Sequence, residues 1–215
     1  MQNSDERASK RTSYLVMICL VAALGGLLFG YDTAVISGAI GFLQSHFQLT
    51  PAMKGWAAAS ALLGCVIGCL VAGVFSDLLG RKKTLLLAAF LFVVSSIGTA
   101  IPERFWVFVV FRILGGVAIG VASLASPMYI AEISPARIRG RMVSVNQFAI
   151  ISGMLVIYFV NYAITRPDNP VWNETTGWRW MFASGCIPAA LFFGLVFSVP
   201  ESPRWLVEQG REQTA

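Results

Sequence analysis

The sequence has little charge, and it lacks the alternation of polar and apolar residues seen in soluble helical domains. Charged residues make up 13% of its 215 residues, whereas soluble domains contain about a quarter. The apolar residues, 56% of the total, occur in long blocks, which excludes a soluble bundle of amphipathic helices. Water is therefore not the main solvent of this chain, and we expect an integral membrane protein.

The cysteines show neither the spacing of a metal site nor that of a disulfide scaffold. All four lie inside apolar blocks, where we expect small packing residues: Cys19, Cys65, Cys69 and Cys186. The net charge of +5 does not indicate a nucleic-acid partner, because the basic residues form short clusters between the blocks. We expect no cofactor, no metal and no enzymatic activity.

Six apolar windows approach or exceed the length that crosses a bilayer, about 20 residues. They cover residues 14–43, 56–79, 84–101, 106–133, 142–164 and 180–199. The sequence thus predicts an all-α membrane protein with an amino-terminal tail at 1–13, a six-helix transmembrane bundle at 14–199 and the start of a linker at 200–215. Glycine pairs at a spacing of one helical turn predict close packing between helices: Gly64 with Gly68, and Gly116 with Gly120.

Positive charge is distributed unequally between the two predicted sides. If the amino terminus is cytoplasmic, the inner segments hold eleven of the 16 lysines and arginines, the outer segments hold four, and Arg112 lies within a span. This bias places both termini and the linker in the cytoplasm. On the outer side, Asn173-Glu174-Thr175 is either a glycosylation acceptor or a chance match.

Two charged residues, Asp32 and Arg112, lie well away from the ends of predicted spans, and a charge at the centre of a span costs about 2.5 to 3.5 kcal/mol. At about 1.5 Å per residue, Asp32 is about 27 Å from the inner face and Arg112 about 10 Å from the outer face of a core about 30 Å thick. The two residues are close enough in depth to pair. A carboxylate holds a proton less tightly beside an arginine than in an apolar site. A contact that forms and breaks would make Asp32 a proton-coupling group; a static ion pair between helices is the alternative.

Polar and aromatic residues in the spans are candidates for binding a hydroxylated solute. Gln147, in the fifth window, can donate and accept hydrogen bonds, which suits the hydroxyl groups of a sugar. A buried amide can equally link two helices, so both interpretations stay open. Phe29, Tyr31 and Tyr129 could stack on a sugar ring, although aromatic residues in spans are more often packing residues.

Acidic and basic residues alternate in the predicted cytoplasmic segments, where they can bridge helix ends. A network that exists in one conformation and breaks in another would bias the population of the two. The candidate residues for such a network are Asp77, Arg81, Glu132, Arg139, Glu201 and Arg204.

Several motifs follow one another in a fixed order along the chain. They are Phe29-Gly30-Tyr31-Asp32, Gly73-Val-Phe-Ser-Asp77-Leu-Leu-Gly80-Arg81-Lys82-Lys83, Arg112-Ile-Leu-Gly115-Gly116, Arg139-Gly140-Arg141 and Pro200-Glu-Ser-Pro-Arg204-Trp205. The second resembles the loop signature of the major facilitator superfamily, and the others resemble its sugar porter family. Ser126-Pro-Met-Tyr-Ile-Ala-Glu132, Asn146-Gln-Phe-Ala-Ile-Ile and Met181-Phe-Ala-Ser are most similar to bacterial members that carry D-xylose with protons.

The resemblance implies the amino-terminal six-helix bundle of the major facilitator fold and transport of a sugar, D-xylose or a similar pentose or hexose, with a proton across a bacterial inner membrane. It implies that Asp32 couples the proton with Arg112 as its partner, and that Gln147 and Phe29 contact the sugar. Passive facilitators of the family carry asparagine where Asp32 stands. Met154 stands where the D-xylose symporters carry a second sugar-binding glutamine, which leaves the identity of the sugar open.

Members of this family have two six-helix halves, and the substrate is held between them. The resemblance therefore implies a carboxyl-terminal six-helix half as a partner, besides the lipid bilayer, the sugar and the proton. Two other functions stay open: a passive sugar facilitator, and a truncated membrane protein that binds a solute without transporting it.

Overall fold

The computed structural model describes residues 2–210, and the side chains from residue 14 onward. The expected tail residues Arg7, Lys10 and Arg11 lie outside the described side chains, and Arg211 lies outside the described residues. The described part is helical and contains no strand: α1 (Gln2–Phe47), α2 (Pro51–Leu79), α3 (Arg81–Ala100), α4 (Phe105–Ile133), α5 (Arg139–Ile164), α6 (Pro170–Trp172), η1 (Asn173–Gly177), α7 (Trp178–Ala183), α8 (Cys186–Val196) and α9 (Pro203–Glu208).

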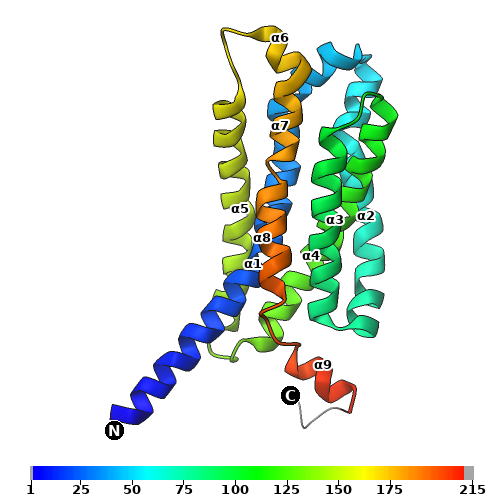
Figure 1. The fold of residues 1–215 in the computed structure, drawn as a ribbon. Coiled ribbons are helices and arrows are strands. Elements are labelled where there is room, and N and C mark those ends of the chain that lie inside the picture. The colour runs from blue at the N-terminus through cyan, green and yellow to red at the C-terminus, as the bar shows by residue number, and fades with distance from the viewer. Residues whose placement is uncertain (1, 211–215) are drawn as a thin grey trace.

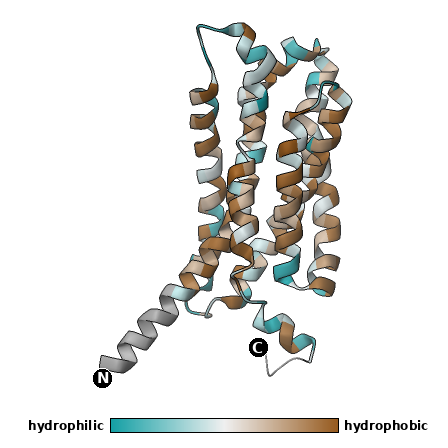
Figure 2. Ribbon diagram, in the orientation of Figure 1, coloured by the Kyte–Doolittle hydropathy of each residue, from teal (hydrophilic) through white to brown (hydrophobic). Residues whose placement is uncertain are grey.

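Within residues 2–210, six helical segments are long and apolar enough to cross a membrane, which confirms the predicted all-α membrane fold. The sixth consists of α6, η1, α7 and α8 together and spans Pro170–Val196. The segments run side by side, and α9 lies at the same end of the bundle as the start of α1 (Figure 1). We call this end the terminus side and the other end the far side. Apolar residues cover the helix shafts between the two ends (Figure 2).

The sixth crossing begins at Pro170, earlier than the predicted residue 180. Asn169 caps this start, because its side chain accepts a hydrogen bond from the Trp172 amide at 3.0 Å. Proline is well suited to the first helical position, where its missing N–H group has no helical partner to lose. The prediction failed here because the polar residues of η1 lower the hydropathy of a segment that is nevertheless helical.

The Asn173 side chain belongs to this turn and is buried. Its amide donates to the Arg166 carbonyl at 2.7 Å and its oxygen accepts from the Arg166 N–H group at 2.9 Å. Both polar ends of the side chain are therefore in use. The structure thus favours a chance match over a glycosylation acceptor for Asn173-Glu174-Thr175.

Small residues bring the helices into backbone contact, as their spacing predicts. A Cβ atom at Gly64 or Gly68 of α2 would overlap backbone atoms of α4, and Gly116 and Gly120 are among their closest neighbours. A Cβ atom at Gly153 of α5 would likewise overlap the Leu27 carbonyl of α1. Helices α1 and α4 are the most buried of the spans, whereas α2 and α5 present most of their surface outward.

Candidate functional site

Asp32 on α1 and Arg112 on α4 form an ion pair inside the bundle. Arg112 Nη1 donates to Asp32 Oδ2 at 2.8 Å and to the Asp32 carbonyl at 3.3 Å. The Arg112 side chain is 1% exposed and the Asp32 side chain 15% exposed. Removing one member of such a buried pair leaves an uncompensated charge. The ion pair therefore favours the packing of α1 against α4. The pair that the two depths predict is present in the structure.

The Arg112 guanidinium also lies near an aromatic ring. Its Cζ lies 5.5 Å from the centre of the Phe182 ring of α7, and its Nε has no hydrogen-bond partner within the described part of the chain. Gly115, one turn along α4, is close enough that a Cβ atom there would lie 3.6 Å from Asp32 Oδ2. Asp32 is therefore the only acid that neutralises Arg112 among the described side chains.

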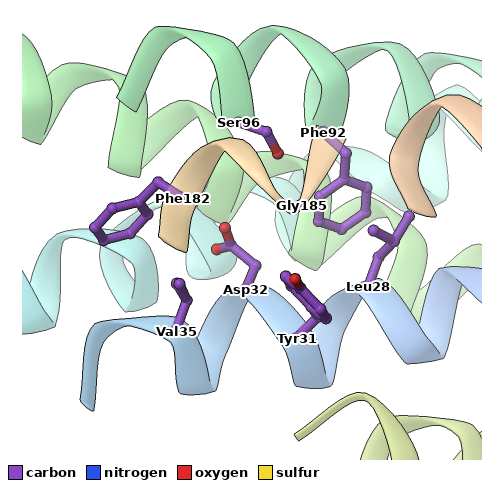
Figure 3. A pocket seen from close by; sticks show the side chains of 8 residues that line it. All are labelled: Leu28, Tyr31, Asp32, Val35, Phe92, Ser96, Phe182 and Gly185. Carbon is purple, nitrogen blue, oxygen red and sulfur yellow. The ribbon is translucent and has the colours of Figure 1, made fainter. Parts of the chain in front are cut away.

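A small cavity of about 10 Å³ lies beside the Asp32 carboxylate (Figure 3). Its walls come from α1, α3 and the junction of α7 and α8, and consist of Leu28, Tyr31, Asp32, Val35, Phe92, Ser96, Phe182 and Gly185. Tyr31 is buried, and its hydroxyl lies 2.7 Å from Ser184 Oγ. Sequence reasoning gave Ser96, Ser184 and Gly185 no role, because small uncharged residues carry no signal without their neighbours.

A second cavity, of about 240 Å³, lies between α1, α2 and α4 and is lined by Phe29, Thr33, Ala58, Ala61, Leu62, Cys65, Arg112 and Ile119. Phe29, predicted to contact a sugar, lines this cavity together with Arg112. Asp32 does not line this cavity. The two members of the ion pair therefore face different spaces.

The other predicted sugar contacts lie on α5. Gln147 is exposed and Met154 is partly buried, and their separation of one heptad places them near the same helix face. Neither residue lines the two cavities described above. Gln147 makes no hydrogen bond to the described side chains. The Gln147 side-chain amide is therefore available on the exposed surface of α5.

Arg81 is the centre of a charged network on the terminus side. Its Nε and Nη2 both donate to the Glu132 carboxylate, at distances between 2.9 and 3.2 Å. Its Nη1 donates to the Ser76 carbonyl at 3.1 Å and to Asp77 Oδ1 at 3.4 Å. Arg81 and Glu132 are almost fully buried, whereas the Asp77 side chain is 73% exposed. The network thus has a buried pair and an exposed branch.

The segment after the sixth span attaches to this network. Glu201 Oε1 accepts from the Lys82 N–H group at 3.0 Å, and the Ser202 hydroxyl donates to Glu132. Trp205 Nε1 donates to the Asp77 carbonyl at 2.9 Å. Sequence reasoning gave Ser202 and Trp205 no role in the network, because neither carries a charge. Ser202 attaches the segment to Glu132 through its hydroxyl, and Trp205 attaches it to the Asp77 carbonyl through its indole.

Two predicted members of the network lie apart from it. Arg204 pairs with Glu208 at 3.2 Å on the exposed surface of α9. Arg139 is exposed and makes no ion pair with residues 14–210.

Tyr129, considered for sugar stacking, is fully buried and donates to the Pro200 carbonyl at 2.8 Å, so it is a packing residue on the terminus side.

Comparison with known proteins places these features in a family. The family model described as "Sugar (and other) transporter" matches residues 18–215. The D-xylose-proton symporter of Escherichia coli (strain K12) is 47% identical over 95% of this chain. The arabinose-proton symporter of Bacillus subtilis (strain 168) is 44% identical over 96% of it. The alignments cover 47% and 45% of these relatives, so the chain spans about half their length.

The solved structures agree. A proton:xylose symporter bound to 6-bromo-6-deoxy-D-glucose matches 94% of this chain with a TM-score of 0.91 and 48% identity, over 48% of that structure's chain. An inward-open structure of the xylose transporter from E. coli matches 94% of this chain with a TM-score of 0.87 and 48% identity, over 52% of that chain. These relatives are transporters and not enzymes. The chain belongs to the sugar (and other) transporter family and has the amino-terminal six-helix bundle of the major facilitator fold.

Proposed function

We propose that this chain forms the amino-terminal half of a proton-coupled sugar symporter that works by alternating access. The observation that carries the proposal is the buried ion pair between Asp32 and Arg112 at 2.8 Å. The names of its relatives, which include symporters of D-xylose and of arabinose with protons and a glucose transport protein, support a pentose or hexose substrate. In this proposal the protein is a multi-pass protein of the bacterial inner membrane.

Protonation of Asp32 links the proton to the conformation. The neutral acid no longer compensates the Arg112 charge, and a buried charge without a partner is unfavourable. The conformation that keeps Arg112 paired therefore loses its advantage, and the population shifts toward one that solvates or re-pairs the guanidinium. Release of the proton restores the ion pair and returns the transporter to its starting state.

The sugar binds between this bundle and a carboxyl-terminal half. Phe29 in the larger cavity offers a ring face, and the exposed Gln147 amide on α5 offers both a donor and an acceptor. Met154 adds an apolar contact on the same face of α5. The partner half supplies the remaining contacts, as expected for a substrate held between two repeats.

The terminus side faces the cytoplasm in this proposal. It carries the exposed residues Arg137, Arg139 and Arg141, and cytoplasmic loops are rich in such residues. The Arg81–Glu132 pair and the segment attached through Glu201 and Ser202 close this side of the bundle. These contacts stabilise only the conformation in which they are formed. They therefore set the relative populations of the conformation closed on this side and the conformation open on it.

Replacing Asp32 with asparagine tests proton coupling. The Asp32→Asn chain, co-expressed with the carboxyl-terminal half of the E. coli symporter, should lose uptake driven by a pH gradient and keep sugar exchange across vesicles. Glu103→Gln, which changes an exposed acid before α4, should alter neither activity. Accumulation that persists in Asp32→Asn contradicts the coupling role. Uptake by the unmodified chain that ignores the pH gradient would identify a passive facilitator.

A further inference from the structure

The two cavities beside the ion pair have no lining residue in common. Asp32 lines the small cavity together with Tyr31, Ser96 and Gly185, whereas Arg112 lines the larger cavity together with Phe29. A molecule in the larger cavity therefore contacts Arg112, and a molecule in the small cavity contacts Asp32. The geometry separates access to the proton acceptor from access to the sugar-facing side.

The small cavity has the size and the polarity to hold one water molecule. Its volume of about 10 Å³ is at the lower limit for a water, which also needs two or more polar partners. Asp32 provides Oδ1, to which no described side chain donates, since Arg112 Nη1 donates to Oδ2. The Ser96 hydroxyl points into the same space from α3 (Figure 3), and it makes no hydrogen bond to residues 14–210.

A chain of hydroxyl groups connects this region with the far side. Tyr31, which lines the small cavity, has its hydroxyl 2.7 Å from Ser184 Oγ. Ser184 in turn donates to the Met181 carbonyl at 2.6 Å, so Tyr31 is the donor in the contact between the two hydroxyls. Ser184 also lines an open groove of about 580 Å³, which includes Arg166, Trp172 and Trp180. Ser184 thus stands between that groove and the Tyr31 hydroxyl.

We propose that the small cavity binds one ordered water, and that protons reach Asp32 through the groove, Ser184, Tyr31 and this water. The inference rests on the proposed symport. For inward transfer the Tyr31 hydroxyl turns from Ser184 Oγ to the water, and the Ser184 hydroxyl turns from the Met181 carbonyl to Tyr31. The water then gives a proton to Asp32 Oδ1 and takes one from Tyr31, Tyr31 takes one from Ser184, and Ser184 takes one from solvent in the groove. Each O–H bond that breaks is replaced, so only Asp32 changes its protonation and no electrons are transferred.

A pair of glycine substitutions on the sixth span tests the water site. A Cβ atom at Gly185 would lie 3.1 Å from Ser96 Oγ and 3.6 Å from Tyr31 Cε1, inside the cavity, whereas a Cβ atom at Gly194 meets nothing within 4 Å. X-ray radiolytic labelling oxidises side chains that adjoin a bound water. We expect labelling of Tyr31 in the unmodified chain and in Gly194→Ala, and its loss in Gly185→Ala.

Transport by the same variants, co-expressed with the carboxyl-terminal half of the E. coli symporter, tests the route. Gly185→Ala should reduce pH-driven uptake by about tenfold and change sugar exchange by less than about twofold. Tyr31→Phe should do the same, because it removes one hydroxyl and keeps the ring. Ser184→Ala has a matched control in Ser198→Ala: both hydroxyls donate at 2.6 Å to the carbonyl three residues earlier, and only Ser184 meets Tyr31.

The readouts separate the inference from the proposed function. Equal labelling of Tyr31 in Gly185→Ala and in the unmodified chain would overturn the water site, whatever the transport result. Labelling that is lost while pH-driven uptake stays unchanged would overturn the route. If the unmodified chain shows exchange but no pH-driven uptake, symport and the route fail together, and the labelling still decides whether the water is bound.

Discussion

Arg81 is approached by two acids whose surroundings differ. Its contact with Glu132 is enclosed, since both side chains are less than a tenth exposed, whereas Asp77 is 73% exposed to the outside. Exposed ion pairs contribute about 0 to 1 kcal/mol, while a buried pair that loses one member leaves a charge without compensation. The two acids should therefore differ in their effect on stability, although both lie within reach of one guanidinium.

Two isosteric substitutions measure this difference. Glu132→Gln should lower the free energy of unfolding by about 3 kcal/mol, because the buried Arg81 charge then keeps only the exposed Asp77 as a counterion. Asp77→Asn should lower it by less than about 1 kcal/mol. Thermal unfolding of the solubilised chain provides the measurement. Equal losses in the two variants would show that burial of the Arg81–Glu132 pair has no energetic consequence.

Met154 offers a test of sugar contact at a single position. A glutamine here would add an amide one heptad from Gln147, and one well-formed hydrogen bond of about 1.4 kcal/mol corresponds to a tenfold change in affinity. We expect Met154→Gln to lower the KM for sugar exchange by about tenfold. Met154→Leu replaces the thioether with an apolar alkyl group of similar size, adds no amide, and should leave the KM unchanged. Identical KM values in the two variants would remove Met154 from the sugar site.

The sequence located charged residues better than hydroxyl groups. Asp32 and Arg112 lie on continuous helices with a constant rise, so their depths, and hence their ability to pair, follow from counting residues. The contact of Tyr31 with Ser184 depends on where the sixth crossing breaks between α7 and α8. That position results from tertiary packing, and no local pattern in the sequence specifies it.

At the scale of elements, the helix pair α2 and α4 shows how spacing becomes packing. Gly64 and Gly68 place a strip without side chains on α2, and the α4 backbone lies directly against it. In lipid such contacts hold helices together through close van der Waals packing, because burial of apolar surface supplies little driving force. The bounds of the spans were harder to predict, as the helical start at Pro170 shows.

Two alanine substitutions on α2 test the role of this contact. Gly68→Ala places a methyl group against the Val117 carbonyl of α4, and overpacking of this kind costs about 1 to 3 kcal/mol. Gly73→Ala lies on the same helix with nothing within 4 Å of its Cβ position. It should leave stability unchanged or raise it by up to about 1 kcal/mol, because alanine is the better helix former. Thermal unfolding that ranks the variants in the opposite order would show that α2 and α4 separate without cost.

For the whole molecule, the buried fraction differs strongly between the spans. The apolar window of α5 is 17% buried and that of α2 is 28% buried, whereas those of α1 and α4 are each 56% buried. The exposed Gln147 lies on α5, and the cavity with Phe29 and Arg112 is bordered by α2. In the proposed transporter these two outer helices therefore carry the substrate contacts toward the second half.

Transport by this chain alone, compared with the co-expressed halves, tests that arrangement. The chain spans 47% of the E. coli symporter, and alternating access needs one six-helix repeat to move against another. We expect no exchange of labelled D-xylose in vesicles that contain only this chain, and exchange once the carboxyl-terminal half is present. The co-expressed halves with Asp32→Asn in this chain should still exchange sugar, which separates assembly from proton coupling. Exchange by the chain alone would mean that copies of one bundle can form the pathway between them, and it would remove the need for a second half.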